Sequence, residues 1–269
     1  MRKQPVSSQV QIEDASMTLV ESAYWQIRRH VIEGVLLPGE QLRVEHVKDK
    51  YGVGAGTLRE ALTLLVADAL VVAEGRKGFR VAPISVEDLE DVTENRVRLE
   101  TEALRQSIQH GNDVWESNVV AAFHRLSLVE QAPDKRGGVA DVDAYEERNR
   151  IFHETLLAAC PSHWLLYFTS ILYCQSERYR RLALAKSPLR RNVHAEHTAL
   201  VKAALNRDAD KACALLTDHI RVMSEAIRLL PGKLFGKQPS RAPAGGAKKA
   251  TGKERETVRK ARRRRTNLN

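Results

Sequence analysis

The first third of the chain repeats one pattern, a short stretch with helical spacing followed by a tight turn. Apolar residues recur three or four positions apart in three such stretches, which predicts three helices. The stretches are 17–34, 44–50 and 58–69. Glycines separate the second from the third, and the third helix begins either at the capping box Thr57-x-x-Glu60 or one turn earlier, at Gly54.

Two short apolar runs, 71–74 and 79–82, flank the string Gly75-Arg76-Lys77-Gly78, a pattern typical of a β-hairpin with a basic tip. Helix, helix, glycine-marked turn, helix and hairpin, in this order, predict a winged helix-turn-helix over 17–83. The third helix of such a domain enters the major groove of DNA. On spacing alone, a generic three-helix packing unit remains an alternative.

The region 84–230 has helical spacing throughout, and it predicts an all-α bundle of about six helices. Ser85 caps the first of them, and Gly111 ends it. The other helices are expected to follow Asp113 and to fall within 140–160, 162–185, 189–206 and 208–230. The absence of a glycine-rich phosphate loop and of strand alternation excludes a nucleotide-binding α/β domain. We therefore predict a mainly α protein with two domains, 17–83 and 84–230.

The N-terminal motifs closely resemble the DNA-binding domain of the GntR family of bacterial transcription regulators. The resemblance rests on Pro38-Gly39-Glu40-x-Leu42-Arg43, Tyr51-Gly52-Val53, Leu58-Arg59-Glu60-Ala61-Leu62, Ala69-Leu70-Val71 and Gly78-Phe79-x-Val81. It implies that Arg43 and Arg59 contact DNA backbone and bases, and that Gly78 lets the wing approach the minor groove. Arginine suits this task because it is the usual bidentate reader of guanine.

One turn departs from the family pattern. The family usually has Ser-Arg-Thr-Pro where this chain has Gly54-Ala55-Gly56-Thr57, so a base contact expected at position 55 is missing. We expect readout to rest on Arg59, Thr57 and backbone amides, at a half-site unlike the commonest one of the family. Arg76 and Lys77 are expected to contact DNA from the wing tip, with solvated turn charges as the alternative.

Histidines interrupt the apolar faces of the predicted bundle. Asn149 and His153 lie four residues apart on one helix face, and His197 and His219 adjoin apolar residues of two later helices. Facing helices can bring such groups together on one ion, and zinc, nickel, manganese and iron are the candidates. On spacing alone, histidines that are merely buried in the core are the alternative.

The stretches containing these residues resemble the FCD domain, the helical effector domain of the FadR-like branch of the family. The resemblance implies that Asn149, His153, His197 and His219 bind a divalent metal (zinc, nickel or manganese). It also implies that Arg96 holds the carboxylate of an organic-acid effector. The first ligand of the family is most often Asp, so the amide of Asn149 is a weaker donor. Binding mainly through the three histidines and an effector oxygen is the alternative. His194 is expected to be an extra ligand or effector contact, with a surface histidine as the alternative.

The resemblance also indicates which effector, DNA site and oligomeric state to expect. Within the branch, three motifs together resemble repressors of glutarate metabolism, for which a C4–C6 dicarboxylate effector is expected. They are the turn Gly52-Val53-Gly54, the string Leu58-Arg59-Glu60-Ala61-Leu62 and the string 160–166. We expect a homodimer on a palindromic operator in double-stranded DNA, because a two-fold symmetric dimer matches a two-fold symmetric site.

Charge separates the end of the chain from the rest. The 269 residues carry a net charge of +9, of which residues 231–269 hold +11, and the other 230 residues hold −2. The tail lacks apolar periodicity, so we expect it to be disordered, as we expect a flexible N-terminus over 1–16. Such a tail binds phosphates without reading bases. Specific recognition must therefore come from a few placed residues.

The remaining sequence features bear on the compartment. The three cysteines form no C-x-x-C pair, the N-terminus has no apolar core of a signal peptide, and no apolar run approaches the length needed to span a bilayer. A cytoplasmic protein without a membrane partner is expected.

Two other functions remain as alternatives to an effector-controlled repressor that is not an enzyme. One is a metal-dependent hydrolase or lyase on the bundle, with Glu196 or Glu154 as the general base. The other is an architectural DNA binder that uses the basic tail.

Overall fold

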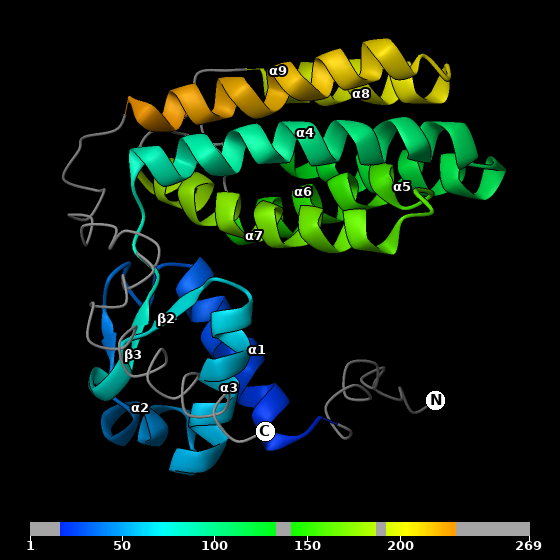
Figure 1. The fold of residues 1–269 in the computed structure, drawn as a ribbon. Coiled ribbons are helices and arrows are strands. Elements are labelled where there is room, and N and C mark those ends of the chain that lie inside the picture. The colour runs from blue at the N-terminus through cyan, green and yellow to red at the C-terminus, as the bar shows by residue number, and fades with distance from the viewer. Residues whose placement is uncertain (1–16, 133–140, 187–191, 230–269) are drawn as a thin grey trace, which may run out of the picture. The chain divides into compact units, whose positions relative to one another are not determined.

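The computed structural model describes residues 17–132, 141–186 and 192–229. In these ranges the protein is mainly helical, which confirms the predicted fold class (Figure 1). The predicted flexible N-terminus and the basic tail lie outside the described residues.

The N-terminal region contains three helices and a small antiparallel sheet of strand order β1-β3-β2. The elements are α1 (Leu19–Ile32), β1 (Gln41–Leu42), α2 (Val44–Tyr51), α3 (Ala55–Ala67), β2 (Val71–Ala73) and β3 (Phe79–Val81). Thr18 and Glu21 form a capping box that begins α1. The buried faces of α1 and α3 meet through Ile27, Leu58 and Leu62, all fully buried. This is the predicted winged helix-turn-helix, with β1 as a strand that the sequence pattern did not predict.

The third helix takes the earlier of its two predicted starts. Gly54 is the N-cap residue of α3, so Thr57 lies within the first turn. Gly52 ends α2 with φ = +63°, a conformation that glycine adopts without steric cost. The turn between the two helices is therefore built by Gly52, which belongs to a motif shared with the family, and by Gly54, which stands where the family usually has serine.

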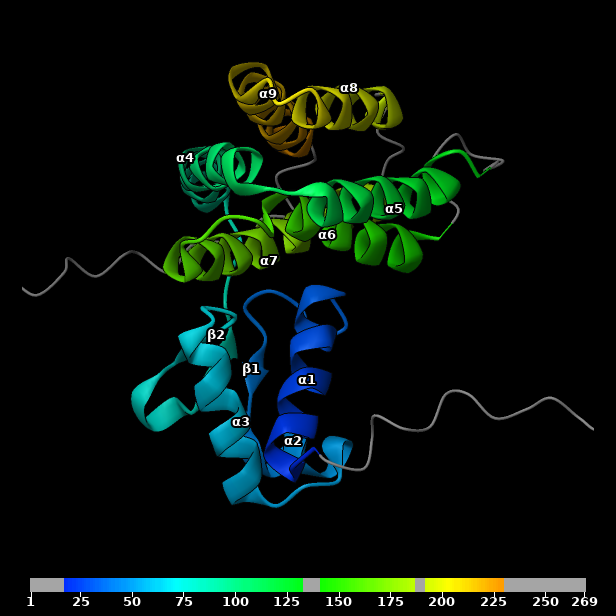
Figure 2. The same ribbon diagram turned by 90° about the vertical axis from the view of Figure 1, so that its right-hand side faces the viewer.

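The C-terminal region is a bundle of six helices among the described residues (Figure 2). They are α4 (Val86–His110), α5 (Asp113–Glu130), α6 (Val142–Leu157), α7 (His163–Lys186), α8 (Val193–Leu205) and α9 (Ala209–Arg228). Its core is rich in aliphatic side chains, with Phe152 and Leu126 fully buried at the centre. Ser85 caps α4 by accepting a hydrogen bond from the backbone N–H of Asp88, as expected.

Helix α7 contacts both regions. Gln175 donates a 2.8 Å hydrogen bond to the backbone carbonyl of Asp68, and Arg178 donates one to the carbonyl of Ala82. Cys174 packs into the N-terminal core. The same helix supplies Tyr173 to the interior of the bundle, so neighbouring residues of α7 face the two halves of the protein.

Candidate metal centre and nucleic-acid interface

The exposed side of α3 carries the residues predicted to read DNA. Leu58, Leu62 and Leu65 fill the buried face of this helix, which leaves Arg59 exposed. Thr57 is half-buried in its first turn, and Arg43 is exposed at the N-cap position of α2. The helix is thus held by its leucines while its polar side stays open.

The wing is held by a residue that the sequence reasoning missed. Arg80 binds Glu74 through two hydrogen bonds of 2.6 and 3.0 Å and donates a third to the carbonyl of Gly39. The pKa of the Glu74 carboxyl is lowered by these bonds. Arg80 therefore fixes the base of the hairpin.

The tip of the wing is a short 3-10 turn. Lys77 is exposed there, whereas the side chain of Arg76 lies outside the described part of the chain. Gly78 has φ = +88°, which a residue with a Cβ adopts only under strain, so the glycine is needed for this turn.

Three predicted metal ligands meet inside the bundle. One nitrogen from each of His153 on α6, His197 on α8 and His219 on α9 lies within 4.8 Å of the others. His153 and His197 are buried, and 11% of the His219 side chain is exposed. Three imidazoles from three helices at this spacing are able to hold one divalent ion.

Two buried atoms test whether this cluster fits a metal. Among the described residues, Nε2 of His197 and Oδ1 of Asn149 are buried and have no hydrogen-bond partner. Leaving such an acceptor unsatisfied costs about 1–3 kcal/mol. Nδ2 of Asn149 donates a 2.7 Å bond to the hydroxyl of Tyr173, so its oxygen is the atom left for another partner. Both orphan atoms are electron-pair donors, as a metal site requires, and the residues fit a bound cation.

Carboxylates lie behind two of the histidines. Nδ1 of His197 is 2.6 Å from Oε1 of Glu130, and Nδ1 of His219 is 2.9 Å from Oε2 of Glu196. Metal-binding histidines commonly donate their second N–H to such a partner. The sequence reasoning did not find Glu130, because 67 residues separate it from His197.

His194 lies beside the triad but is not part of it. Its Nδ1 is 2.9 Å from Oε2 of Glu130, its Nε2 is 2.7 Å from Nε2 of Gln131, and its ring stacks on Phe123. Both ring nitrogens are therefore engaged by protein groups.

Arg96 is buried on the α7 side of the cluster. Its guanidinium binds Glu100 through 2.6 and 3.2 Å bonds, donates to Ser176 and lies over the ring of Tyr173. The Tyr173 ring is in turn 5.7 Å from that of His153. An effector carboxylate at Arg96 has to share this cation with Glu100.

A second arginine, which the sequence reasoning missed, mirrors Arg96. Arg180 also lies over the Tyr173 ring and donates to Ser176, and its charge is balanced by the buried Glu146. No local pattern in the sequence indicates this pairing, because Glu146 and Arg180 come from different helices.

Burial and positive neighbours favour the neutral form of His153. The pKa of His153 is lowered well below its usual value, first by burial and then by the charges of His219, His197, Arg96 and Arg180. Burial raises the pKa of Glu130, but the hydrogen bonds from His197 and His194 outweigh it and leave that pKa lowered. A neutral imidazole beside an ionised carboxylate is the state that binds a metal.

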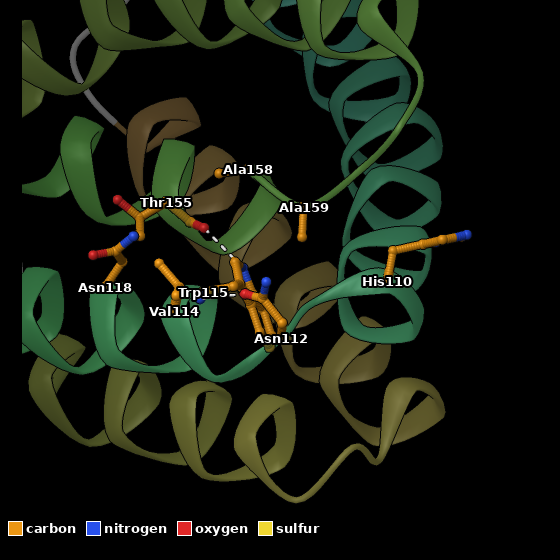
Figure 3. Close-up of a pocket in the computed structure, with 8 residues that line it drawn as sticks. All are labelled: His110, Asn112, Val114, Trp115, Asn118, Thr155, Ala158 and Ala159. Atoms are coloured by element: carbon orange, nitrogen blue, oxygen red, sulfur yellow. Dashed lines mark hydrogen bonds between the residues drawn. The ribbon is translucent and has the colours of Figure 1, made fainter.

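A separate pocket of about 360 Å³ opens near the start of α5 (Figure 3). Two residues of its lining are joined by a hydrogen bond, because the indole nitrogen of Trp115 donates a 3.1 Å bond to the backbone carbonyl of Thr155. The described residues that line it include no arginine or lysine, so it offers no strong cation for an organic acid.

Comparison with known proteins decides the family. The profile for bacterial regulatory proteins of the gntR family matches residues 19–81, and that of the FCD domain matches residues 91–222. A relative named as an uncharacterized HTH-type transcriptional regulator, BphR of Paraburkholderia xenovorans, is 44% identical over 78% of this chain and 86% of its own length. The chain belongs to the GntR family of transcriptional regulators.

One further relative supports the family assignment of this GntR regulator, and one solved structure shows the same fold. The HTH-type transcriptional repressor GlaR of Escherichia coli K12 is 33% identical over 76% of this chain and 93% of its own. The solved structure of E. coli McbR/YncC covers 79% of this chain and 98% of its own with a TM-score of 0.66, and at 14% identity it shows the shared fold.

The family makes the protein a DNA-binding regulator with an effector domain, and not an enzyme. Glu154, one of the two bases that a hydrolase was expected to use, lies on the surface and pairs with Arg150. No described helix of the regulator is long and apolar enough to cross a membrane.

Proposed function

We propose that this GntR regulator is a cytoplasmic repressor whose operator binding is released by a small organic acid, bound at a metal held by Asn149, His153, His197 and His219. The observation that carries the proposal is the orphan buried nitrogen of His197 in a cluster of three histidines. The orphan buried oxygen of Asn149, one helical turn before His153 on α6, supports it. The relative named a transcriptional repressor supports the sign of regulation.

The donor set indicates which ion the site prefers. Three imidazoles and one amide are all neutral, and imidazole suits zinc and nickel, whereas manganese favours carboxylates. We therefore place zinc and nickel before manganese. Because no ligand neutralises the ion, an anionic effector completes its coordination, and a C4–C6 dicarboxylate keeps one carboxylate for Arg96.

The DNA side of the proposal assigns 17–83 to reading DNA and 84–230 to binding the effector. A homodimer places two copies of α3 on the half-sites of a palindrome. Arg43, Thr57, Arg59 and the wing residues Arg76, Lys77 and Gly78 make the contacts. The turn at Gly54 and Ala55 lacks the base-reading side chain of the family, so the preferred half-site differs from the commonest one.

Fluorescence anisotropy on the palindromes upstream of the protein's own and neighbouring genes tests the DNA side. Arg59→Ala abolishes specific binding, whereas Arg125→Ala, which removes an exposed arginine of α5, leaves it unchanged. Equal affinity of wild type and Arg59→Ala for the operator would show that α3 is not the reading helix.

The effector side is tested by adding C4–C6 dicarboxylates to the bound complex. Removing Arg96 alone would leave the buried Glu100 uncompensated and cost about 3–5 kcal/mol of stability. The double variant Arg96→Met with Glu100→Gln avoids this, and it should bind operator normally but resist release. Normal release from the double variant would place the effector elsewhere.

A further inference from the structure

Glu130 is the residue on which two histidines converge. It is the last residue of α5, and only 3% of its side chain is exposed. One carboxylate oxygen is 2.6 Å from Nδ1 of His197, and the other is 2.9 Å from Nδ1 of His194. Each oxygen therefore has its own imidazole partner.

Gln131 determines which atom donates in the hydrogen bond between His194 and Glu130. Its side-chain nitrogen, which only donates, lies 2.7 Å from Nε2 of His194, so that ring nitrogen accepts and the proton of His194 is on Nδ1. Stacking on Phe123 holds the same ring from its face. His194 thus donates to Glu130 and pins one of its oxygens.

The hydrogen bond between His197 and Glu130 determines whether Nε2 of His197 carries a proton or a lone pair toward the cluster. A carboxylate only accepts, so the proton of His197 is on Nδ1, facing Glu130. Nε2 then carries a lone pair, and this is the buried nitrogen that has no partner among the described residues. His197 is fully buried, so contact with solvent water does not determine which of its two ring nitrogens carries the proton. The hydrogen bond to Glu130 does.

We propose that Glu130 is a positioning residue that, pinned by His194, holds His197 in the tautomer and orientation that aim Nε2 at the metal. This assigns a role to His194 that is neither ligand nor effector contact. The inference rests on the proposed metal centre, but the tautomer of His197 is a property of the metal-free protein.

The isosteric variant Glu130→Gln tests the proposal in the full-length protein. An amide has one donor and one acceptor end, so it cannot accept from both histidines at once. Glu147→Gln, in an exposed pair with Arg150, is the matched control. Thermal unfolding of each variant establishes that it is folded.

The first readout is zinc affinity, measured by competition with a chelator. Loss of a partner behind a metal-binding histidine lowers metal affinity about 10–100-fold. We expect a fall of that size for Glu130→Gln and less than a twofold change for Glu147→Gln. Wild-type zinc affinity in Glu130→Gln would overturn the proposal.

The second readout is the histidine tautomer, from ¹⁵N–¹H correlation spectra of the metal-free protein. Wild type should show His197 protonated on Nδ1, and Glu130→Gln should show protonation on Nε2 or a mixture. An Nε2 proton on His197 in wild type would overturn the proposal. Failure of wild type to bind zinc, with the Nδ1 proton present, would instead count against the metal centre and leave the role of Glu130 in place.

Discussion

Asn149 makes the candidate centre unusual in its charge. An amide stands in place of the carboxylate that the family most often uses, so the candidate ligand set contains no acidic residue, and the carboxylates of Glu130 and Glu196 stand behind the histidines. The amide nitrogen of Asn149 donates a hydrogen bond to the hydroxyl of Tyr173, so the amide oxygen is the atom that remains for a cation. We therefore expect a low affinity for the ion, and we expect its positive charge to remain available to an anion.

Asn149→Asp should raise zinc affinity at least tenfold, because a carboxylate adds a negative charge next to the ion, and should improve manganese binding relative to zinc. Chelator competition with each metal measures both effects. Asn118→Asp, on the exposed side of α5, is the control and should change neither. Unchanged zinc affinity in Asn149→Asp would remove Asn149 from the ligand set.

The lowered pKa of His153 predicts a pH dependence of the metal-free protein. The unfolded chain binds a proton at this histidine near pH 6.5, whereas the folded protein does not until a much lower pH. The unfolded state thus holds more protons below pH 6.5, and the free energy of unfolding falls as the pH falls, by up to about 1.4 kcal/mol per pH unit. Urea denaturation between pH 7.5 and 5.5 measures this slope. His153→Gln should remove the contribution of this one proton from the slope of unfolding free energy against pH. An equal slope in both proteins would contradict the prediction.

Sequence reasoning found the residues that a motif marks and missed those that only folding brings together. The histidines of the triad stand on apolar helix faces and were identified, and the structure places them within one cluster. Glu130 and Arg180 have partners 67 and 34 residues away, and no periodicity connects such pairs. Arg96 was found through a family motif, but its pairing with Glu100 became visible only in the structure.

At the scale of elements, apolar spacing predicted the helices well because each buries one continuous stripe. It missed β1, since two residues are too few to show alternation, and this strand is recognised only by its pairing of Gln41 with Arg80 and Leu42 with Phe79. The start of α3 could not be chosen from sequence because a capping box and a glycine cap compete within one turn. The structure uses the glycine.

The end of α3 shows a strained turn. The backbone N–H of Ala69 bonds to the carbonyl of Val66, and that of Leu70 to the carbonyl of Leu65, a Schellman motif whose left-handed position is Ala69, with φ = +56°. A residue with a Cβ is unfavourable in this conformation, which glycine adopts freely.

Ala69→Gly should therefore stabilise the protein by about 0.5–1 kcal/mol, which thermal unfolding measures as a rise in Tm. Ala121→Gly, at an exposed position inside α5, should do the reverse by a similar amount, because glycine is unfavourable within a helix. A lower Tm for Ala69→Gly would show that the turn is not strained.

At the scale of the whole molecule, α7 lies between the candidate centre and the DNA-binding half. Tyr173 and Ser176 face the two buried arginines, while Gln175 and Arg178 bond to carbonyls at residues 68 and 82. A small rotation or shift of α7 that follows a new ligand at the arginines necessarily changes these bonds. If the effector binds at Arg96 as proposed, these bonds are a physical route from it to the DNA-binding half.

Gln175→Met removes the bond to the carbonyl of Asp68, and also the 3.1 Å bond that Gln175 accepts from Arg178, while keeping the length of the side chain. Operator affinity without effector should stay within a few-fold of wild type, and the loss of affinity on adding a releasing dicarboxylate should become several-fold smaller. Anisotropy titrations with and without the acid measure both. Gln109→Met, on the exposed side of α4, is the control. Full release from Gln175→Met would exclude these bonds from the coupling.

The strand β1 has a consequence for how specificity is inherited. Its two residues pair with the wing strand β3 and lead directly into Arg43 at the start of α2, while Arg80 of the wing bonds back to Gly39. The wing and Arg43, which is predicted to contact DNA, are thereby linked by backbone pairing and a side-chain hydrogen bond, although nearly 40 residues separate them in the sequence. We expect that a chimera exchanging only the recognition helix between relatives would mix two DNA-contacting surfaces, whereas exchange of residues 39–81 as a unit would transfer operator choice.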